Sequence, residues 1–428
     1  MSFSQRVETF SHDYLKCCAY IRDFGAGEDI FTKMLFSKLS ASSQLLEDFL
    51  DVHGAKNNRD WFYYRELAAA VRHLSLGGYA QKHILNRLHF YELEDDVEFE
   101  KDSRKTRNFF TRTLRQIAPA VLEEAAALQI PAPADTFSEA DFPPVMSDSE
   151  MLADNVDSGM EKQRGKDLVK IAGEFLNIAR HFDELEFYEP FDLQKIMSIV
   201  PDRVNEVEIR TFEMRTHNLQ SSFDTYVALG GLKTGAKNLR KLRGTFSVAL
   251  HLLEIMGRLL HFYERHLSKD VYKDVFKKAR RRLKDLASAE TLLDRTINYG
   301  LYYVCYFLSS GKNPAKAILN ENIERSSIEV GVPVNLGFHS RPSLLVARIV
   351  RHYGGEVTLC AGERRFDAGS VLDIQWAGGL IRKENIDRVI FEGDARALHD
   401  IEILAGVNYG EDTFGKGVPL PRELEYLR

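Results

Sequence analysis

Apolar residues in the first 128 positions recur at helical spacing. The first stripe alternates steps of four and three residues and consists of Phe3, Val7, Phe10, Tyr14, Cys17 and Ile21. Such spacing places apolar side chains along one face of a helix. Similar patterns over residues 30–50, 61–76 and 105–128 predict further helices, with a break at Gly77-Gly78. The pattern predicts an N-terminal helical domain over residues 1–128.

Residues 129–160 have a different composition. They contain four of the twelve prolines in the chain and seven acidic residues, but no lysine or arginine. A segment with so little apolar surface gains too little from burial to offset the loss of chain entropy. We expect a flexible, acidic, proline-rich linker over 129–160.

Helical periodicity returns over residues 161–326 and predicts a second helical region. Its last helix is expected to start with Asn313 as N-cap and Pro314 in the first helical position. The most apolar stretch, residues 301–308, is much shorter than the roughly 20 residues that cross a bilayer. It is better interpreted as a buried helix.

Beyond residue 326 the pattern becomes that of a small mixed domain over residues 327–412. Segments around 328–336, 356–360, 364–368 and 386–394 have strand character, and a turn is expected at Gly362-Glu363. Helices are indicated after the first, third and fourth of these strands. The order β, α, β, β, short α, β, α favours an antiparallel sheet with helices on one face. The tail, 413–428, shows no clear element.

The overall composition is that of a globular protein with two or three domains. The chain has 428 residues, a net charge of −6 and four cysteines, which show neither a disulfide framework nor metal-binding spacing. The first residues lack the apolar core of a signal peptide. These features predict a soluble, reduced, cytoplasmic protein without membrane insertion.

The most specific chemistry lies at the start of the helix predicted from residue 341. His339 precedes Arg341 and Pro342, and Gly337 permits a sharp turn before it. The first amide groups of a helix have no partner within the helix and, with the helix dipole, favour a phosphate. A neutral imidazole can accept a phosphoryl group, and a guanidinium can bind its oxygens. His339 and Arg341 are therefore candidates for phosphoryl transfer.

The sequence Gly337-Phe-His-Ser-Arg-Pro342, followed by an apolar helix, resembles the active-site motif of the HPr family. HPr proteins are the histidine-containing phosphocarriers of the bacterial sugar phosphotransferase system. The resemblance covers about 85 residues, 327–412, and implies an open-faced β-sandwich of order βαββαβα. It implies that His339 accepts phosphate from an enzyme I-like donor and passes it to an enzyme II-type acceptor. Arg341 would stabilise the phosphate.

The resemblance also implies a regulatory serine at the start of the short helix. Ser370 occupies this place, where a serine kinase would act in some members of the family, and Val371 and Leu372 would help to dock partners. The alternative is that Ser370 only caps a helix. Asp373, Gln375 and Trp376 depart from the small or apolar residues usual in the family.

The segment 233–284 is strongly basic. It holds fifteen basic and four acidic residues, a local net charge of +11 in a chain of net charge −6. Such a surface could attract an acidic protein or nucleic acid, or it could simply be a solvated helix face. The helical spacing of Val275, Ala279, Leu283 and Leu286 predicts the buried side of one of its helices.

Other candidate sites have little support in the sequence. Gly230–Asn238 does not fit a phosphate-binding loop, because Gly235 is followed by Ala236 before Lys237 where that loop has glycine directly before lysine. His251, His261 and His266 share a predicted helix, but their spacing matches no metal motif, so no metal and no cofactor are assigned. Two functions stay open. The chain is a phosphocarrier or regulatory protein rather than a stand-alone enzyme, or it is a non-catalytic scaffold with a silent HPr-like domain and a helical binding module.

Overall fold

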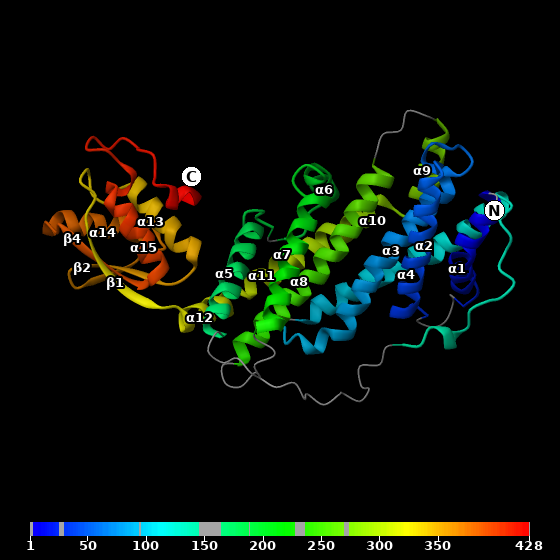
Figure 1. The fold of residues 1–428 in the computed structure, drawn as a ribbon, viewed down its shortest axis with the longest axis horizontal. Helices are drawn as coiled ribbons and strands as arrows, with labels where there is room; N and C mark the ends of the chain where they lie inside the picture. Colours follow the sequence, from blue (N-terminus) through cyan, green and yellow to red (C-terminus); the bar gives the residue numbers. More distant parts are fainter. Residues whose placement is uncertain are drawn as a thin grey trace. The chain divides into compact units, whose positions relative to one another are not determined.

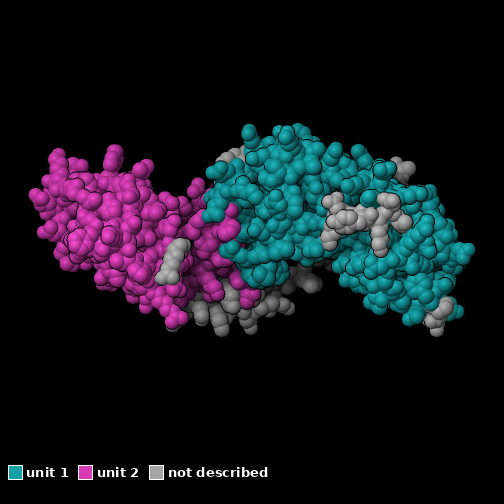
Figure 2. Space-filling view, turned by 90° about the horizontal axis from the view of Figure 1, so that it is seen from above, with its two compact units in different colours: residues 1–155, 182–220, 243–310 teal, residues 156–181, 221–242, 311–428 magenta. Residues whose placement is uncertain are grey.

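The computed structural model describes most of the chain and divides it into two compact units (Figure 2). The described residues are 3–24, 30–93, 96–144, 164–187, 189–226, 236–268 and 274–427. Unit 1 comprises residues 1–155, 182–220 and 243–310, and unit 2 comprises 156–181, 221–242 and 311–428. Each unit contains residues from more than one predicted domain, because helices late in the sequence pack against helices early in it. In unit 1, for example, the Tyr299 and Ser103 hydroxyls are 2.9 Å apart.

Helices form most of the described residues before residue 324 (Figure 1). They are α1 (Phe3–Phe24), α2 (Lys33–Val52), α3 (Phe62–Arg87), α4 (Asp96–Ala127), α5 (Arg164–Asp183), α6 (Leu193–Ile199), α7 (Glu206–Tyr226), α8 (Ala236–Phe262), α9 (Asp274–Leu286), α10 (Ala289–Asp294), α11 (Tyr302–Ser310) and α12 (Lys312–Asn322). Short 3-10 turns are η1 (Ala55–Asn57), η2 (Leu88–Phe90) and η3 (Glu139–Asp141), and π-helical turns are η5 (Tyr263–Leu267) and η6 (Arg295–Leu301). The mostly helical character is confirmed. In the described part of the chain, no helix is long and apolar enough to cross a membrane.

The break predicted at Gly77-Gly78 is wrong, because α3 continues through both residues. A Cβ atom at Gly77 would lie 2.7 Å from the ring of Phe110, and one at Gly78 would lie 2.4 Å from the ring of Phe36. Both rings are fully buried. The two glycines therefore allow α2 and α4 to press aromatic rings against the backbone of α3.

We expect Gly78→Ala to destabilise the fold by about 1–3 kcal/mol, because the new methyl group overlaps the buried Phe36 ring. Gly173→Ala in α5 is the matched control, since a Cβ there meets no atom within 4 Å. It should stabilise by up to about 1 kcal/mol through helix propensity. Denaturant titration measures both changes. Equal stability of the two variants would mean that the Phe36 ring moves aside without cost.

Part of the predicted linker is packed on α1 instead of being free. Phe142 is buried and contacts Tyr20, with 5.0 Å between ring centroids. The ammonium group of Lys16 pairs with Asp135 and lies 4.2 Å from the centroid of Phe137. Phe137 and Phe142 thus pack against α1, which the acidic composition of the segment did not indicate. Residues 145–160 of the predicted linker lie outside the described residues.

The two predictions for the last helices before residue 324 had different outcomes. Residues 301–308 are confirmed as a buried helical segment, in which Val304 and Phe307 are almost fully enclosed. The N-cap predicted at Asn313 is wrong. Helix α12 starts two residues earlier, with Gly311 as N-cap, and Pro314 lies within its first turn.

A four-stranded antiparallel sheet forms the core of the C-terminal part of unit 2. Its strands are β1 (Arg325–Gly331), β2 (Val357–Ala361), β3 (Arg364–Asp367) and β4 (Arg388–Asp394), in the spatial order β1-β4-β2-β3. The helices between and after them are α13 (Ser340–Tyr353), α14 (Val371–Glu384) and α15 (Ala395–Gly406). The small antiparallel sheet predicted after residue 326 is therefore confirmed.

The three helices cover one face of this sheet (Figure 1). Alternate residues such as Leu359, Val389 and Phe391 are buried, whereas their neighbours point to the opposite face. Val346, Ile374 and Ile401 are among the buried residues that the helices contribute to the same core. The period of two in the strands and the apolar faces of the helices create this single core.

Residues 413–427, for which no element was predicted, pack onto the same domain. They end in a 3-10 turn, η8 (Arg422–Leu427), whose Leu424 and Leu427 are buried. Arg348 donates a hydrogen bond to the carbonyl oxygen of Leu427 at 2.7 Å, which ties the turn to α13. Short 3-10 turns carry no extended periodicity, so the apolar pattern could not reveal this one.

Candidate functional site

The chain enters α13 through a tight, left-handed turn. Leu336 and Gly337 have φ angles of +61° and +63°. The N–H of His339 donates a hydrogen bond to the carbonyl oxygen of Gly337 at 2.8 Å. Gly337 adopts this conformation without steric cost, whereas Leu336 does so against its preference. The turn places His339 at the N-cap of α13, as predicted.

Phe338 fixes the position of the histidine next to it. Its ring is buried and makes edge contacts with Phe391 and Tyr409, with centroids 6.2 and 5.2 Å apart. Helix α14 approaches so closely that a Cβ at Gly378 would lie 2.9 Å from the carbonyl oxygen of Phe338. The backbone before His339 is therefore packed between the sheet and α14.

The imidazole of His339 is held by a buried carboxylate. Its Nε2 lies 3.0 Å from Oε2 of Glu411, whose side chain is fully buried. A carboxylate only accepts hydrogen bonds, so in this contact the imidazole donates from Nε2 and carries its proton there. The lone pair is then on Nδ1, the nitrogen that can act as a nucleophile. The His339 side chain is partly exposed, which leaves it within reach of a partner.

Arg341 shares the same carboxylate. Its Nη1 lies 3.5 Å from Oε1 of Glu411 and donates to the carbonyl oxygen of Gly415 at 3.3 Å. The guanidinium is half exposed. The backbone N–H groups of Ser340 and Arg341 lie in the first turn, where no intrahelical acceptor exists. An imidazole, a guanidinium and two amides thus surround the start of α13.

Glu411 is the site residue that the sequence analysis missed. It follows the 3-10 turn η7 (Asn408–Gly410) and is held by a β-bridge to Gly417 and by a hydrogen bond from Asp412 N–H to Lys416 O. It lies 72 positions after His339 in the sequence, beside the predicted end of the domain. No motif or periodicity distinguishes this single glutamate from others.

Ser370 is the N-cap of α14, and its Oγ accepts a hydrogen bond from the N–H of Asp373 at 3.3 Å. The capping role is thus present, while phosphorylation of Ser370 stays a prediction. Of the two predicted docking residues, Val371 packs partly against the core and Leu372 is 75% exposed. Trp376, which departs from the HPr pattern, is 79% exposed. Two large apolar side chains on α14 therefore face solvent.

The basic segment 233–284 contributes to α8, η5 and α9, and its residues 233–235 and 269–273 lie outside the described residues. In α9, Ala279 and Leu283 are buried as predicted, and Leu286 is partly buried. Arg282 pairs with Glu124 at 3.2 Å and lies 3.8 Å from the ring centroid of Tyr63. Part of the basic charge therefore serves packing within unit 1, and binding of an acidic protein or nucleic acid stays a prediction.

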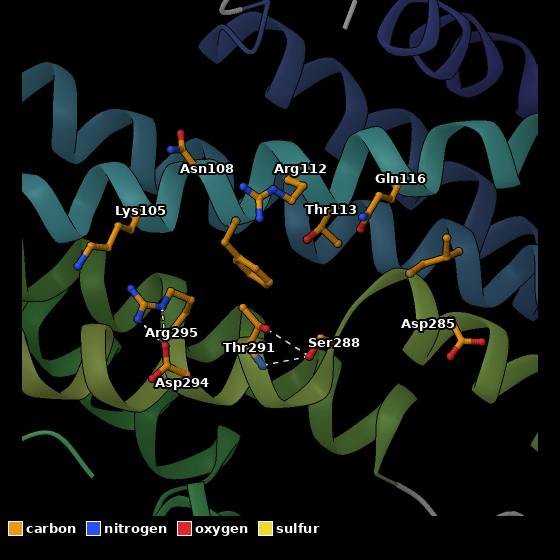
Figure 3. A pocket seen from close by; sticks show the side chains of 12 residues that line it. Lys105, Asn108, Arg112, Thr113, Gln116, Asp285, Ser288, Thr291, Asp294 and Arg295 are labelled. Atoms are coloured by element: carbon orange, nitrogen blue, oxygen red, sulfur yellow. Dashed lines mark hydrogen bonds and ion pairs between the residues drawn. The ribbon is translucent and has the colours of Figure 1, made fainter. Parts of the chain in front are cut away.

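A polar cavity of about 540 Å³ opens between α4 and the α10–η6 segment of unit 1 (Figure 3). Its three cations are Lys105, Arg112 and Arg295. Lys105 pairs with Asp102 at 2.6 Å, and Arg295 pairs with Asp294. Because two of the cations already have carboxylate partners, the cavity lacks the concentrated charge of an anion site.

Comparison with known proteins gives no assignment. No family model, no curated protein and no solved structure matches the chain. A functional conclusion must therefore rest on the residues around His339 and on their geometry.

Proposed function

We propose that this chain is a phosphocarrier or regulatory protein of the phosphotransferase type, which accepts a phosphoryl group on His339. The observation that carries the proposal is the contact between His339 Nε2 and the buried Glu411 at the start of α13. It gives the ring the tautomer in which Nδ1 is nucleophilic.

The proposed step is a direct transfer between two nitrogen atoms. The lone pair of Nδ1 attacks the phosphorus of a phosphohistidine on an enzyme I-like donor. A new N–P bond forms, the N–P bond of the donor breaks, and its electron pair returns to the donor nitrogen. The proton on Nε2 stays in place on the Glu411 side. Transfer to an enzyme II-type acceptor reverses the same step.

Two further features support this proposal. Residues 337–342 resemble the HPr motif, and the described elements follow the order β1-α13-β2-β3-α14-β4-α15 that the family fold implies. The exposed Leu372 and Trp376 lie on α14, which contacts the backbone of Phe338. These side chains offer apolar surface to a partner that reaches His339. A carrier of this kind would act in the cytoplasm.

The proposal is tested by incubating the chain with phosphoenolpyruvate and enzyme I, and in parallel with phosphoramidate. Phosphoramidate is a small donor that needs no docking surface. An acid-labile gain of one phosphoryl group in the intact mass supports the carrier chemistry. Labelling by phosphoramidate alone, if it is absent from His339→Ala, would mean that His339 is reactive but that the protein donor differs. No labelling by either donor would overturn the proposal in favour of the scaffold alternative.

Arg341→Ala is expected to slow phosphoryl uptake by about tenfold or more while leaving the fold intact. The half-exposed guanidinium can leave Glu411 and bind the phosphoryl oxygens, whose charge develops during transfer. Arg341→Lys should recover part of the rate, because it keeps the charge but loses the planar fork. Time courses of intact mass measure the three rates. Equal rates in the wild type and both variants would mean that Arg341 has no role in phosphoryl transfer.

A further inference from the structure

Three histidines from distant parts of the sequence meet inside unit 1. His73 lies on α3, His261 on α8 and His266 in the π-helical turn η5. One ring nitrogen from each lies within 4.8 Å of the other two. His73 and His266 are buried, and His261 is partly buried. Among the described residues, this is the only such group of potential ligands.

His73 has no evident structural reason to be a histidine. Its side chain is 1% exposed, and neither ring nitrogen has a hydrogen-bond partner in the described part of the chain. A buried polar group without a partner is rare and costs free energy. Its ring stacks on that of His261, with 4.2 Å between the centroids. A phenylalanine or leucine would fill the same space without this cost.

The other two rings are oriented by carboxylates. His261 Nδ1 lies 2.8 Å from Oε1 of Glu206, and His266 Nδ1 lies 3.0 Å from Oε2 of Glu66. These contacts leave Nε2 of both rings available. A carboxylate behind the distal nitrogen is the usual support of a histidine that binds a metal, because it fixes the tautomer and raises the basicity of the ligand.

We propose that His73, His261 and His266 form a binding site for one divalent transition metal ion of the Zn²⁺ class. Three imidazole ligands suit zinc, and a water molecule or a small anion would take the fourth position. Ligation at Zn–N distances of 2.0–2.1 Å requires the nitrogens to be roughly 3.4 Å apart. The rings must therefore draw together slightly. His73, which no hydrogen bond holds, can turn to do so.

Carboxylates and arginines both surround the cluster. Glu66 and Glu206 stand behind two of the ligands, while Arg65 Nη1 lies 3.3 Å from His266 Nδ1 and the charges of Arg72 and Arg258 act on His73. Burial, the neighbouring His261 and His266, and the charges of Arg72 and Arg258 lower the pKa of His73 well below its ordinary value.

The sequence analysis assigned no metal because the spacing of the histidines was judged on an α-helix. His261 and His266 are five residues apart, which places them on different faces of a regular α-helix. The π-helical turn η5 changes this register and brings the two rings to a centroid distance of 5.7 Å. Turns of this kind occur often at functional sites. His73 is 188 positions away from His261, beyond the reach of any local motif.

The test compares zinc binding by the wild-type chain with that of two variants, all without a histidine tag. Each protein is stripped with a chelator, dialysed against Zn²⁺ and measured for metal content. His73→Phe removes one ligand but keeps the buried volume. His83→Ala is the matched control, because His83 also lies on α3 and packs against a histidine of α8, His251, at a centroid distance of 4.2 Å.

The proposal expects one zinc per chain in the wild type and in His83→Ala, and none in His73→Phe. Zinc at a hundredfold excess over Kd should also raise the Tm of the wild type by roughly 5 °C but not that of His73→Phe. Co²⁺ should give the intense visible absorption of tetrahedral cobalt in the wild type. If His73→Phe does not fold, the cobalt spectrum of the wild type alone tests whether the metal site exists. Weak octahedral absorption, or equal zinc content in wild type and His73→Phe, overturns the proposal. The result does not depend on the role proposed for His339.

Discussion

The His339→Ala variant is expected to take up no phosphoryl group under conditions in which the wild-type chain is fully modified. The variant lacks the only nitrogen nucleophile that the buried Glu411 orients at the start of α13. It keeps the amides, Arg341 and the packing of Phe338. The loss should be complete rather than partial, because the acceptor atom itself is missing. Intact mass after incubation with either donor measures it.

His399→Ala is the matched control for this prediction. His399 is an exposed histidine on α15 in the same domain. Its removal should leave phosphoryl uptake unchanged. Circular dichroism should show that both variants are folded, since His339 is partly exposed and caps no helix through its side chain. His339→Ala is expected to unfold at a somewhat lower temperature than His399→Ala, because the buried Glu411 loses its partner at 3.0 Å. Retained acid-labile phosphate in His339→Ala would place the acceptor on another residue and would refute the assignment.

The local part of the candidate site could be predicted from the sequence. A glycine for a left-handed turn, a histidine before a helix and a proline in its first turn are short-range signals, and the structure has His339 at the N-cap that they indicate. Alternation in residues 356–360 and 386–394 likewise revealed the strands. Such features depend on neighbours within a few residues, which a single sequence displays directly.

The parts that the sequence did not reveal depend on contacts between distant residues. Glu411 reaches His339 only because residues 407–418 fold back on α13, and a single carboxylate has no recognisable pattern. Gly77 and Gly78 suggested a break because glycine weakens helices, whereas here tertiary packing against Phe36 and Phe110 requires their small size. The contact between His73 and His261 could not be predicted for the same reason, because the two residues are far apart in the sequence.

Arg65→Met is expected to destabilise the chain by about 3–5 kcal/mol, the second large effect that the structure predicts. The Arg65 side chain is 6% exposed and contacts three carboxylates: Glu47 at 2.9 Å, Asp51 at 2.8 Å and Glu66 at 3.0 Å. Glu47 and Glu66 are themselves buried. Methionine fills the volume of the arginine stem. It does not replace the positive charge or the N–H donors that the guanidinium gives to these carboxylates. Denaturant titration at neutral pH measures the loss.

The control for this prediction is Arg22→Met. Arg22 pairs with Asp23 on the surface of α1, where solvent screens the pair. Its replacement should change the free energy of unfolding by no more than about 1 kcal/mol. Both variants remove one arginine from an ion pair in unit 1. A larger loss of stability in Arg65→Met than in Arg22→Met would therefore be caused by the burial of the Arg65 ion pairs.

The destabilisation by Arg65→Met should shrink as the pH falls. Burial alone raises the pKa of Glu66, but a hydrogen bond from His266 and the charges of His266 and Arg65 together hold it below its ordinary value. Hydrogen bonds from Arg65 and Lys56 likewise offset burial and lower the pKa of Asp51. A carboxyl group with a lowered pKa stabilises the fold above its unfolded pKa, and this contribution disappears as the pH falls through the folded value. Without Arg65 these pKa values rise, so the wild type loses more stability on acidification than the variant does. A constant difference from pH 7 to pH 4 would mean that lost packing, and not lost charge pairing, explains the role of Arg65.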